Sequence, residues 1–228
     1  MMHRTPRWLL AVLLVVAPAW VSAETSVSPG INAAYQDADP NRWRGVFERD
    51  GREVWDRRHD ILTALNLRPG MAVADVGAGT GFFAMMFAEA VGKRGLVYAV
   101  DITPEFVEDI RMQASGLGRR NVRGIVNTAR SAMLPANSVD LVFTSDTYHH
   151  FEYPHDMLAS IHAALRPGGE LVVIDFKRIP GFSHPWVLGH VRAGEETVRA
   201  EIEAAGFELI EQRNDFMQTQ YFLRFRKQ

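Results

Sequence analysis

The chain has 228 residues, of which 47% are hydrophobic and 23% charged, values typical of one globular domain with a short extension. It contains no cysteine, which excludes disulfides, thiolate catalysis and cysteine-ligated zinc sites. The formal net charge is −2 and no basic run is interleaved with aromatic residues, so we expect no nucleic-acid partner.

The first 23 residues are typical of a secretory signal peptide. Arg4 and Arg7 form a positive segment, and the apolar run after them is too short to span a bilayer comfortably. The small residues at 21–23 predict cleavage before Glu24, with an uncleaved membrane anchor as the alternative. We therefore expect a periplasmic or secreted mature protein, without stable membrane insertion once the signal is removed.

Residues 24–60 are interpreted as an N-terminal extension. The extension begins with a polar segment, to about Asn41, that we expect to be a loose leader. A helical pattern then starts at Trp43, is interrupted near Gly51, and resumes toward the following domain. The Arg-Pro-Gly sequence at residues 68–70 predicts the end of that helical region.

A strand, a glycine-rich turn and a helix follow one another between residues 73 and 91. Small and β-branched residues at 73–76 predict a strand buried on both faces, and FFAMMFAEAV at 82–91 predicts a helix. Gly77, Gly79 and Gly81 lie at every second position between them. Such a turn brings backbone N–H groups and a helix N-terminus to a ligand, because glycine tolerates positive φ.

The spacing of this turn indicates the charge of its ligand. Asp75 lies two residues before the first glycine, and its carboxylate would repel a pyrophosphate. The third glycine comes one residue too early for the dinucleotide pattern G-x-G-x-x-G. The site therefore suits a ligand with an ammonium or sulfonium charge, and an NAD-dependent oxidoreductase is disfavoured.

The second half of the site follows at the next strand, which is predicted at residues 96–100 and ends at Asp101. An acid at the tip of the second strand of a βαβ unit accepts hydrogen bonds from ribose hydroxyls.

Later helices are predicted at residues 103–118, 153–165 and 195–205. Later strands are predicted at residues 121–126, 139–144, 170–176, 207–212 and 220–226.

The pattern D-x-G-x-G-x-G at residues 75–81 resembles motif I of the class I S-adenosylmethionine-dependent methyltransferases. LRPGG at residues 165–169 resembles the stretch that ends their cofactor-binding half, and YHHFE and YFLRF are similar to bacterial predicted methyltransferases with secretory signals. The resemblance covers residues 61–227. It implies one doubly wound, Rossmann-like α/β domain over residues 61–228, with a seven-stranded, mostly parallel sheet and an antiparallel last strand.

The same resemblance implies S-adenosylmethionine as the cofactor and a small-molecule methyl acceptor. It also makes Arg52, Glu53 and Trp55 candidate lid residues, with a solvated helix face as the alternative. Many relatives place an acid in the loop before residues 134–135 to accept a hydrogen bond from the adenine amine, whereas here backbone carbonyls would accept it. The implied cofactor-binding residues are Asp75, Gly77, Ala78, Gly79, Gly81, Asp101, Ile102, Thr128, Ala129 and Asp146.

In that family the acceptor approaches beside the end of the fourth strand, so Tyr148, His149 and His150 are candidate catalytic residues. One histidine would act as a base or orient the acceptor, because its ordinary pKa lies near working pH. On an extended segment the two rings point apart, and we expect only one to serve. We favour His150, with Tyr148 lining the acceptor pocket on the same side. In the alternative, one ring satisfies backbone groups and the other is solvated.

A metal site is an alternative use of the same region, because several ligand-type side chains fall close together. Adjacent histidines that point apart do not favour it, and the sequence offers no second ligand cluster, so we expect no metal. The side chains concerned are Asp146, His149, His150, His155 and Asp156.

Residues 177–194 are predicted to form a long irregular segment over the carboxyl ends of the strands, where loops usually carry specificity. His190 and Arg192 are candidate substrate contacts there, with surface charge as the alternative. The sequence thus predicts a methyltransferase for a small molecule, and leaves the acceptor atom and the oligomeric state open. A non-catalytic binder of adenosyl ligands is the alternative, because a secretory signal carries the protein away from the cytosol, where this cofactor is made.

Overall fold

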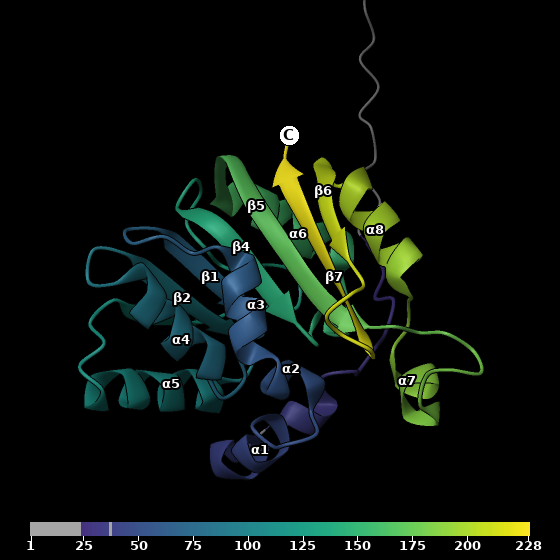
Figure 1. Ribbon diagram of the computed structural model, residues 1–228, viewed down its shortest axis with the longest axis horizontal. Coiled ribbons are helices and arrows are strands. Elements are labelled where there is room, and N and C mark those ends of the chain that lie inside the picture. The colour runs from purple at the N-terminus through teal and green to yellow at the C-terminus, as the bar shows by residue number, and fades with distance from the viewer. Residues whose placement is uncertain (1–23, 37) are drawn as a thin grey trace, which may run out of the picture.

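The computed structural model describes residues 24–36 and 38–228, so the predicted signal peptide lies outside the described part of the chain. Among the described residues, no helix is both long enough and apolar enough to cross a membrane. The described elements form three layers, with a twisted sheet in the middle and helices on both sides (Figure 1).

A seven-stranded sheet forms the middle layer, in the order β3-β2-β1-β4-β5-β7-β6. Strand β7 runs antiparallel to β5 and β6, and the other neighbours are parallel, which confirms the predicted fold. The strands are β1 (Ala72–Val76), β2 (Leu96–Asp101), β3 (Val122–Val126), β4 (Val139–Ser145), β5 (Leu165–Phe176), β6 (Phe207–Arg213) and β7 (Gln220–Lys227).

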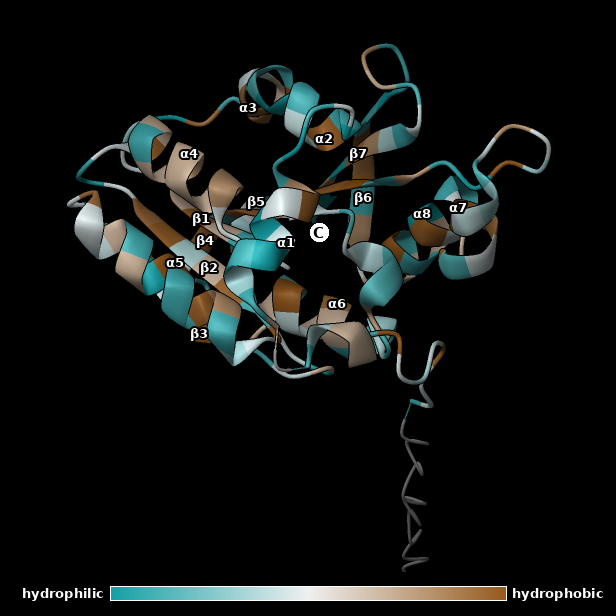
Figure 2. Cartoon of the chain, turned by 90° about the horizontal axis from the view of Figure 1, so that it is seen from below, coloured by the Kyte–Doolittle hydropathy of each residue, from teal (hydrophilic) through white to brown (hydrophobic). Residues whose placement is uncertain are grey.

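The helices cover both faces of the sheet, because strand side chains alternate between two hydrophobic clusters. On β4, Val142 belongs to the cluster under α6 and α8, whereas Leu141 and Phe143 belong to the cluster under α3 and α4. In Figure 2, brown, hydrophobic segments run through the central strands β1 and β4. The helices are η1 (Ala33–Tyr35), α1 (Pro40–Phe47), α2 (Glu53–Asp56), α3 (Arg58–Leu65), α4 (Phe82–Val91), α5 (Pro104–Gly116), η2 (Tyr148–His150), α6 (Pro154–Ala164), α7 (Pro185–His190) and α8 (Glu195–Ala204).

Strand β5 begins at Leu165, earlier than the predicted start at Glu170. Val139 pairs with Leu165 and Leu141 with Glu170, so residues 166–169, which follow the helix predicted at 153–165, form a bulge between two bridges. Gly168 has a φ of 73°, which permits the extra residues without a steric penalty.

The N-terminal extension is packed on the domain, so the prediction of a loose leader is wrong for its described residues. Glu24 accepts backbone hydrogen bonds from His155 and Asp156 at the start of α6, at 3.1 and 3.0 Å. The helical region divides into α1, α2 and α3 and begins at Pro40, after an N-cap hydrogen bond to the side chain of Asp39. In Figure 1, α1, α2 and α7 lie at the edge where the parallel strands end.

Candidate cofactor and acceptor site

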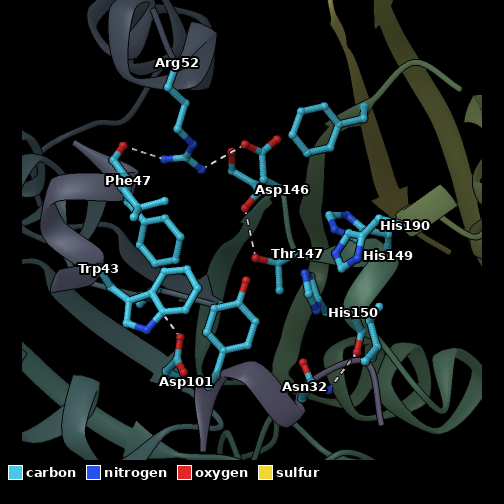
Figure 3. Close-up of a pocket in the computed structure, with 18 of the residues that line it drawn as sticks. Asn32, Trp43, Phe47, Arg52, Asp101, Asp146, Thr147, His149, His150 and His190 are labelled. Carbon is cyan, nitrogen blue, oxygen red and sulfur yellow. Dashed lines mark hydrogen bonds and ion pairs between the residues drawn. The ribbon is translucent and has the colours of Figure 1, made fainter. Parts of the chain in front are cut away.

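A cavity of about 960 Å³ lies at the carboxyl ends of the parallel strands. Its wall includes the turn between β1 and α4, the ends of β2, β4 and β5, helix α7 and the N-terminal extension. Doubly wound α/β sheets bind their ligands in this crevice. In Figure 3, Trp43 and Asp101 lie on one side of the cavity, and His149, His150 and His190 lie on the other.

The glycine turn lines the first side. Gly77, Ala78 and Gly79 lie in the cavity wall, as predicted, whereas Gly81 does not. All three glycines have positive φ, 80°, 53° and 82° in chain order, which explains why this residue type is needed. A Cβ on Gly81 would lie 2.5 Å from Cγ1 of Ile110. Gly81 therefore allows α4 to pack closely against α5.

Asp101 holds the turn in place from the end of β2. Its Oδ2 accepts the N–H of Gly79 at 2.8 Å, and its Oδ1 accepts the N–H of Thr103 at 2.9 Å. Burial raises the pKa of this carboxyl, and hydrogen bonds from Thr103, Gly79 and Ile102 act in the opposite direction. Ile102, Thr128 and Ala129, which are also predicted to bind the cofactor, line the same cavity as Asp101.

Asp75 is 3% exposed and lines the cavity. Its Oδ2 has no hydrogen-bond partner among the described residues. Burial, and then the charge of Asp101, raise the pKa of Asp75 to about 8. A buried carboxylate oxygen without a partner is costly, so this atom fits a ligand that brings a positive charge or a hydrogen-bond donor.

Replacing Asp75 with asparagine should raise the stability of the ligand-free protein and weaken the binding of adenosyl ligands. The pKa of Asp75 in the folded protein lies above its ordinary value of 3.8. The carboxyl therefore stabilises the fold below pH 3.8, and this stabilisation is lost as the pH rises to about 8. The variant should not lose stability in this way, and its free energy of unfolding at pH 8.5 should exceed that of the parent by about 1–3 kcal/mol. Urea unfolding at pH 5 and pH 8.5 measures the difference.

Calorimetry on the same variant should show about 10–100-fold weaker binding of S-adenosylhomocysteine, the loss expected when a charged partner is removed. Unchanged affinity together with unchanged stability at pH 8.5 would contradict the assignment of Asp75 to the ligand site.

Asp146 joins the end of β4 to the N-terminal extension. Its Oδ2 accepts a hydrogen bond from Nη2 of Arg52 at 2.8 Å, and its Oδ1 accepts one from Gln220 at 2.9 Å. Arg52 also donates from Nη1 to the carbonyl of Phe47 at 2.8 Å. Asp146 lines the cavity as predicted, but both of its oxygens are already bonded by the protein. Arg52 therefore ties α1 to the strand end, which agrees with its predicted place in a lid.

The other two predicted lid residues differ from each other. Glu53 lines the cavity and accepts the N–H of Thr219 at 2.7 Å, whereas Trp55 packs on Phe82 with ring centroids 5.4 Å apart and is not in the wall.

An aromatic row in the extension covers the cavity and was not predicted. The ring centroids of Tyr35 and Trp43 are 4.7 Å apart, and those of Trp43 and Phe47 are 5.1 Å apart. All three residues line the cavity. The spacing of Trp43 and Phe47, four residues apart, is the one signal in the sequence that places two of these rings on the same helix face.

The candidate catalytic residues lie in η2, a 3₁₀ turn, and not on an extended segment. Because of this turn, the rings of His149 and His150 stand with centroids 4.3 Å apart, and both line the cavity. The prediction that they point apart is therefore wrong. Tyr148 is buried in the core and its hydroxyl donates to Glu201 at 2.8 Å, so the prediction that it lines the acceptor pocket is also wrong.

Asp175, near the end of β5, orients His149. The Nδ1 of His149 lies 2.8 Å from Oδ1 of Asp175, and the backbone N–H of His149 donates to Oδ2 at 3.0 Å. Burial acts to lower the pKa of His149, but the charge and hydrogen bond of Asp175 outweigh it and the pKa is raised. Burial, and then the charge of His149, lower the pKa of His150 to about 3, so His150 is the weaker base. The only sign of Asp175 in the sequence is that an acidic residue lies near the end of the predicted strand that became β5, the neighbour of β4.

Helix α7 adds His190 to the two histidines of η2. Its ring centroid lies 5.2 Å from those of His149 and His150, and the ring stacks on Trp186 at 4.6 Å. His190 lines the cavity as predicted. Arg192 does not: it donates two hydrogen bonds to Glu201, at 2.8 and 2.7 Å.

Comparison with known families agrees with this arrangement. Residues 74–173, from β1 into β5, match the family model described as a methyltransferase domain. This stretch of the chain is similar to the methyltransferase domain that the model describes. S-adenosylmethionine is the cofactor that this domain implies. The match includes the glycine turn, Asp101 and η2, and it ends two residues before Asp175.

The chain also aligns with curated methyltransferases. It is 33% identical over 127 residues to the ubiquinone/menaquinone biosynthesis C-methyltransferase UbiE of Hydrogenovibrio crunogenus, over 55% of this chain and 49% of that protein. It is 31% identical over 120 residues to the demethylmenaquinone methyltransferase of Geobacillus kaustophilus, over 52% of this chain and 50% of that protein. The chain therefore spans about half the length of these relatives.

Among solved structures, a SAM-dependent methyltransferase from Aquifex aeolicus resembles the chain with a TM-score of 0.73 at 26% identity. This likeness covers 83% of the present chain and 98% of the other. Because the coverage is wider than residues 74–173, the methyltransferase fold extends beyond the matched region and includes more of the sheet and its helices.

Proposed function

We propose that the protein transfers a methyl group from S-adenosylmethionine to a small-molecule acceptor. The observation that carries this proposal is the single cavity that contains both the glycine turn with Asp101 and the histidines of η2 and α7. Groups suited to a cofactor and groups suited to an acceptor thus share one space. The curated relatives named for quinone methylation support an acceptor of small-molecule size.

The residues at the glycine turn fit an adenosyl ligand with a positive charge. Gly77 and Gly79 let the ligand approach the main chain, and each carboxylate oxygen of Asp101 keeps lone-pair capacity beyond its one backbone hydrogen bond. The unpartnered Oδ2 of Asp75 offers a partner for an ammonium group. When bound, S-adenosylmethionine supplies a methyl group that its sulfonium charge has already activated.

The other side of the cavity is suited to orient an acceptor and to exclude water. Phe176, Trp186 and Val187 line it beside the histidines, and the ring of Tyr35 from the extension stands 5.4 Å from that of His150. Asp175 holds the imidazole of His149, which leaves Nε2 to accept a proton from an acceptor or to fix its position. In-line displacement depends on such positioning, because small errors in alignment cost large factors in rate.

Calorimetric titration of the purified chain with S-adenosylmethionine, S-adenosylhomocysteine and NAD tests the cofactor half of the proposal. We expect one site per chain for the two adenosyl ligands and no binding of NAD, because Asp75 disfavours a pyrophosphate. Binding of NAD without binding of S-adenosylhomocysteine would overturn the proposal.

We further propose that the protein is exported and begins at Glu24 after cleavage. Arg4, Arg7, the apolar run and the small residues at 21–23 support this proposal. N-terminal sequencing of the protein from periplasm and cytosol of its host should find Glu24 first in the periplasmic fraction. An intact Met1 in the soluble cytosolic fraction would contradict it.

A further inference from the structure

Three histidine rings from two separate elements converge at one end of the cavity. His149 and His150 come from η2, and His190 comes from α7. Each can offer one ring nitrogen such that the three atoms lie within 4.8 Å of one another. We propose that these three histidines bind one divalent transition-metal ion, for which Zn²⁺ is the probe.

Two ring nitrogens of this cluster are buried and unpartnered in the described structure. Nε2 of His149 and Nδ1 of His150 have no hydrogen-bond partner within residues 24–36 and 38–228. Leaving a buried polar atom without a partner costs stability, and two such atoms on neighbouring rings make the cost greater. A metal ion between the rings satisfies both nitrogens at once.

Asp175 prepares His149 for this role. Its carboxylate lies 2.8 Å from Nδ1 of His149, which favours a proton on Nδ1 and leaves the lone pair of Nε2 directed to the cavity. Histidine ligands of metal ions commonly make this outer hydrogen bond to a carboxylate. Around the cluster, Phe176 stands against the ring of His149 at 5.8 Å, and Trp186 stacks on His190. These rings form an apolar shell that limits the freedom of both ligands.

The donor set indicates the class of ion. Neutral imidazoles suit Zn²⁺, Co²⁺, Ni²⁺, Cu²⁺ and Fe²⁺, whereas Mg²⁺ and Ca²⁺ prefer oxygen ligands. In a tetrahedral site with Zn–N distances near 2.0–2.1 Å, the three nitrogens would stand about 3.4 Å apart. The observed separation of up to 4.8 Å requires the ring nitrogens to approach one another by up to about 1.4 Å, which side-chain rotations provide.

Three protein ligands leave a fourth position facing the cavity, the arrangement typical of catalytic zinc sites. An acceptor with a hydroxyl, thiol or carboxylate group could occupy this position, and the ion would promote loss of its proton. This consequence rests on the proposed methyl transfer, whereas binding of the ion does not.

Calorimetry of the chelator-treated protein with Zn²⁺ tests the proposal directly. We expect one Zn²⁺ per chain, no comparable binding of Mg²⁺, and intense visible absorption of four-coordinate Co²⁺ when that ion is substituted. His190→Ala should weaken Zn²⁺ binding by more than about 100-fold, because loss of an outer partner alone costs about 10–100-fold. Asp175→Asn should fall within that smaller range.

His59→Ala is the matched control, because His59 is exposed on α3 and lies outside the cavity wall. It should bind Zn²⁺ like the parent. His190 is less buried than His149, so its replacement should leave the fold intact, which circular dichroism and retained binding of S-adenosylhomocysteine verify. Failure of the parent to bind Zn²⁺, or equal affinity for Zn²⁺ in His190→Ala and His59→Ala, would overturn the metal site. Either result leaves the adenosyl titration, and with it the methyl-transfer proposal, untouched.

Discussion

Gly79→Val should weaken the binding of S-adenosylhomocysteine by at least about 100-fold, which corresponds to about 2.7 kcal/mol. Gly79 lines the cavity with a φ of 53°, where a β-branched residue is strained. A Cβ at this position would already stand 3.1 Å from the ring of Phe47, so the two methyl groups of valine have no room except toward the ligand. Calorimetry with the variant and the parent measures the loss.

Gly118→Val separates this effect from general backbone strain. Gly118 has a comparable φ of 63°, no atom would lie within 4 Å of an added Cβ, and the residue is not in the cavity wall. This variant should lose a similar amount of stability and bind S-adenosylhomocysteine like the parent. Parental affinity in Gly79→Val would show that the cofactor does not lie against the glycine turn.

His149→Ala should lower methyl transfer by about 10²–10⁴-fold while the affinity for S-adenosylhomocysteine stays nearly unchanged. The ring of His149 is held by Asp175 and lines the cavity, and its Nε2 has no hydrogen-bond partner among the described residues. The loss is expected whether this nitrogen takes a proton itself or binds the proposed ion. Turnover is to be measured with a panel of thiol, phenol, amine and metalloid acceptors.

Tyr148→Phe is the matched control for this experiment, because Tyr148 is adjacent in sequence but directed to Glu201 in the core. It should keep near-parental turnover and lose about 1 kcal/mol of stability with its hydrogen bond. Near-parental rates for His149→Ala would remove this histidine from the reaction. A parent that binds the cofactor but transfers no methyl group to any acceptor would favour a non-catalytic adenosyl binder.

The cofactor half of the site is largely predictable from sequence. Residues 82–91 are predicted to be a helix and form α4 with those bounds, because glycines mark both of its ends. Asp75, Gly77, Gly79 and Asp101 all lie in the cavity wall as predicted. Gly81 is the exception, since its neighbour is Ile110 of α5, a contact that spacing alone does not reveal.

The acceptor half follows much less from sequence. Alternation along an extended segment predicts that His149 and His150 point apart, yet the N–H of His150 donates to the carbonyl of Thr147 at 2.8 Å and closes a 3₁₀ turn. That turn sends Tyr148 into the core and places both histidine rings at the cavity. The irregular segment predicted at residues 177–194 contains α7, which brings His190 to the same place.

The resemblance to a known family implied the class of fold, and the residue pattern alone predicted the strands of the sheet, most of the helices that cover it and the position of the glycine turn. These features depend on side-chain periodicity and on glycines within a few residues of one another, so local preference is enough to specify them. Only the tertiary structure decided what faces the acceptor. The pairs His149–Asp175 and Arg52–Asp146 are separated by 26 and 94 residues, and they meet because β4, β5 and the extension end at one edge of the sheet. No local pattern specifies which distant side chains will share that edge.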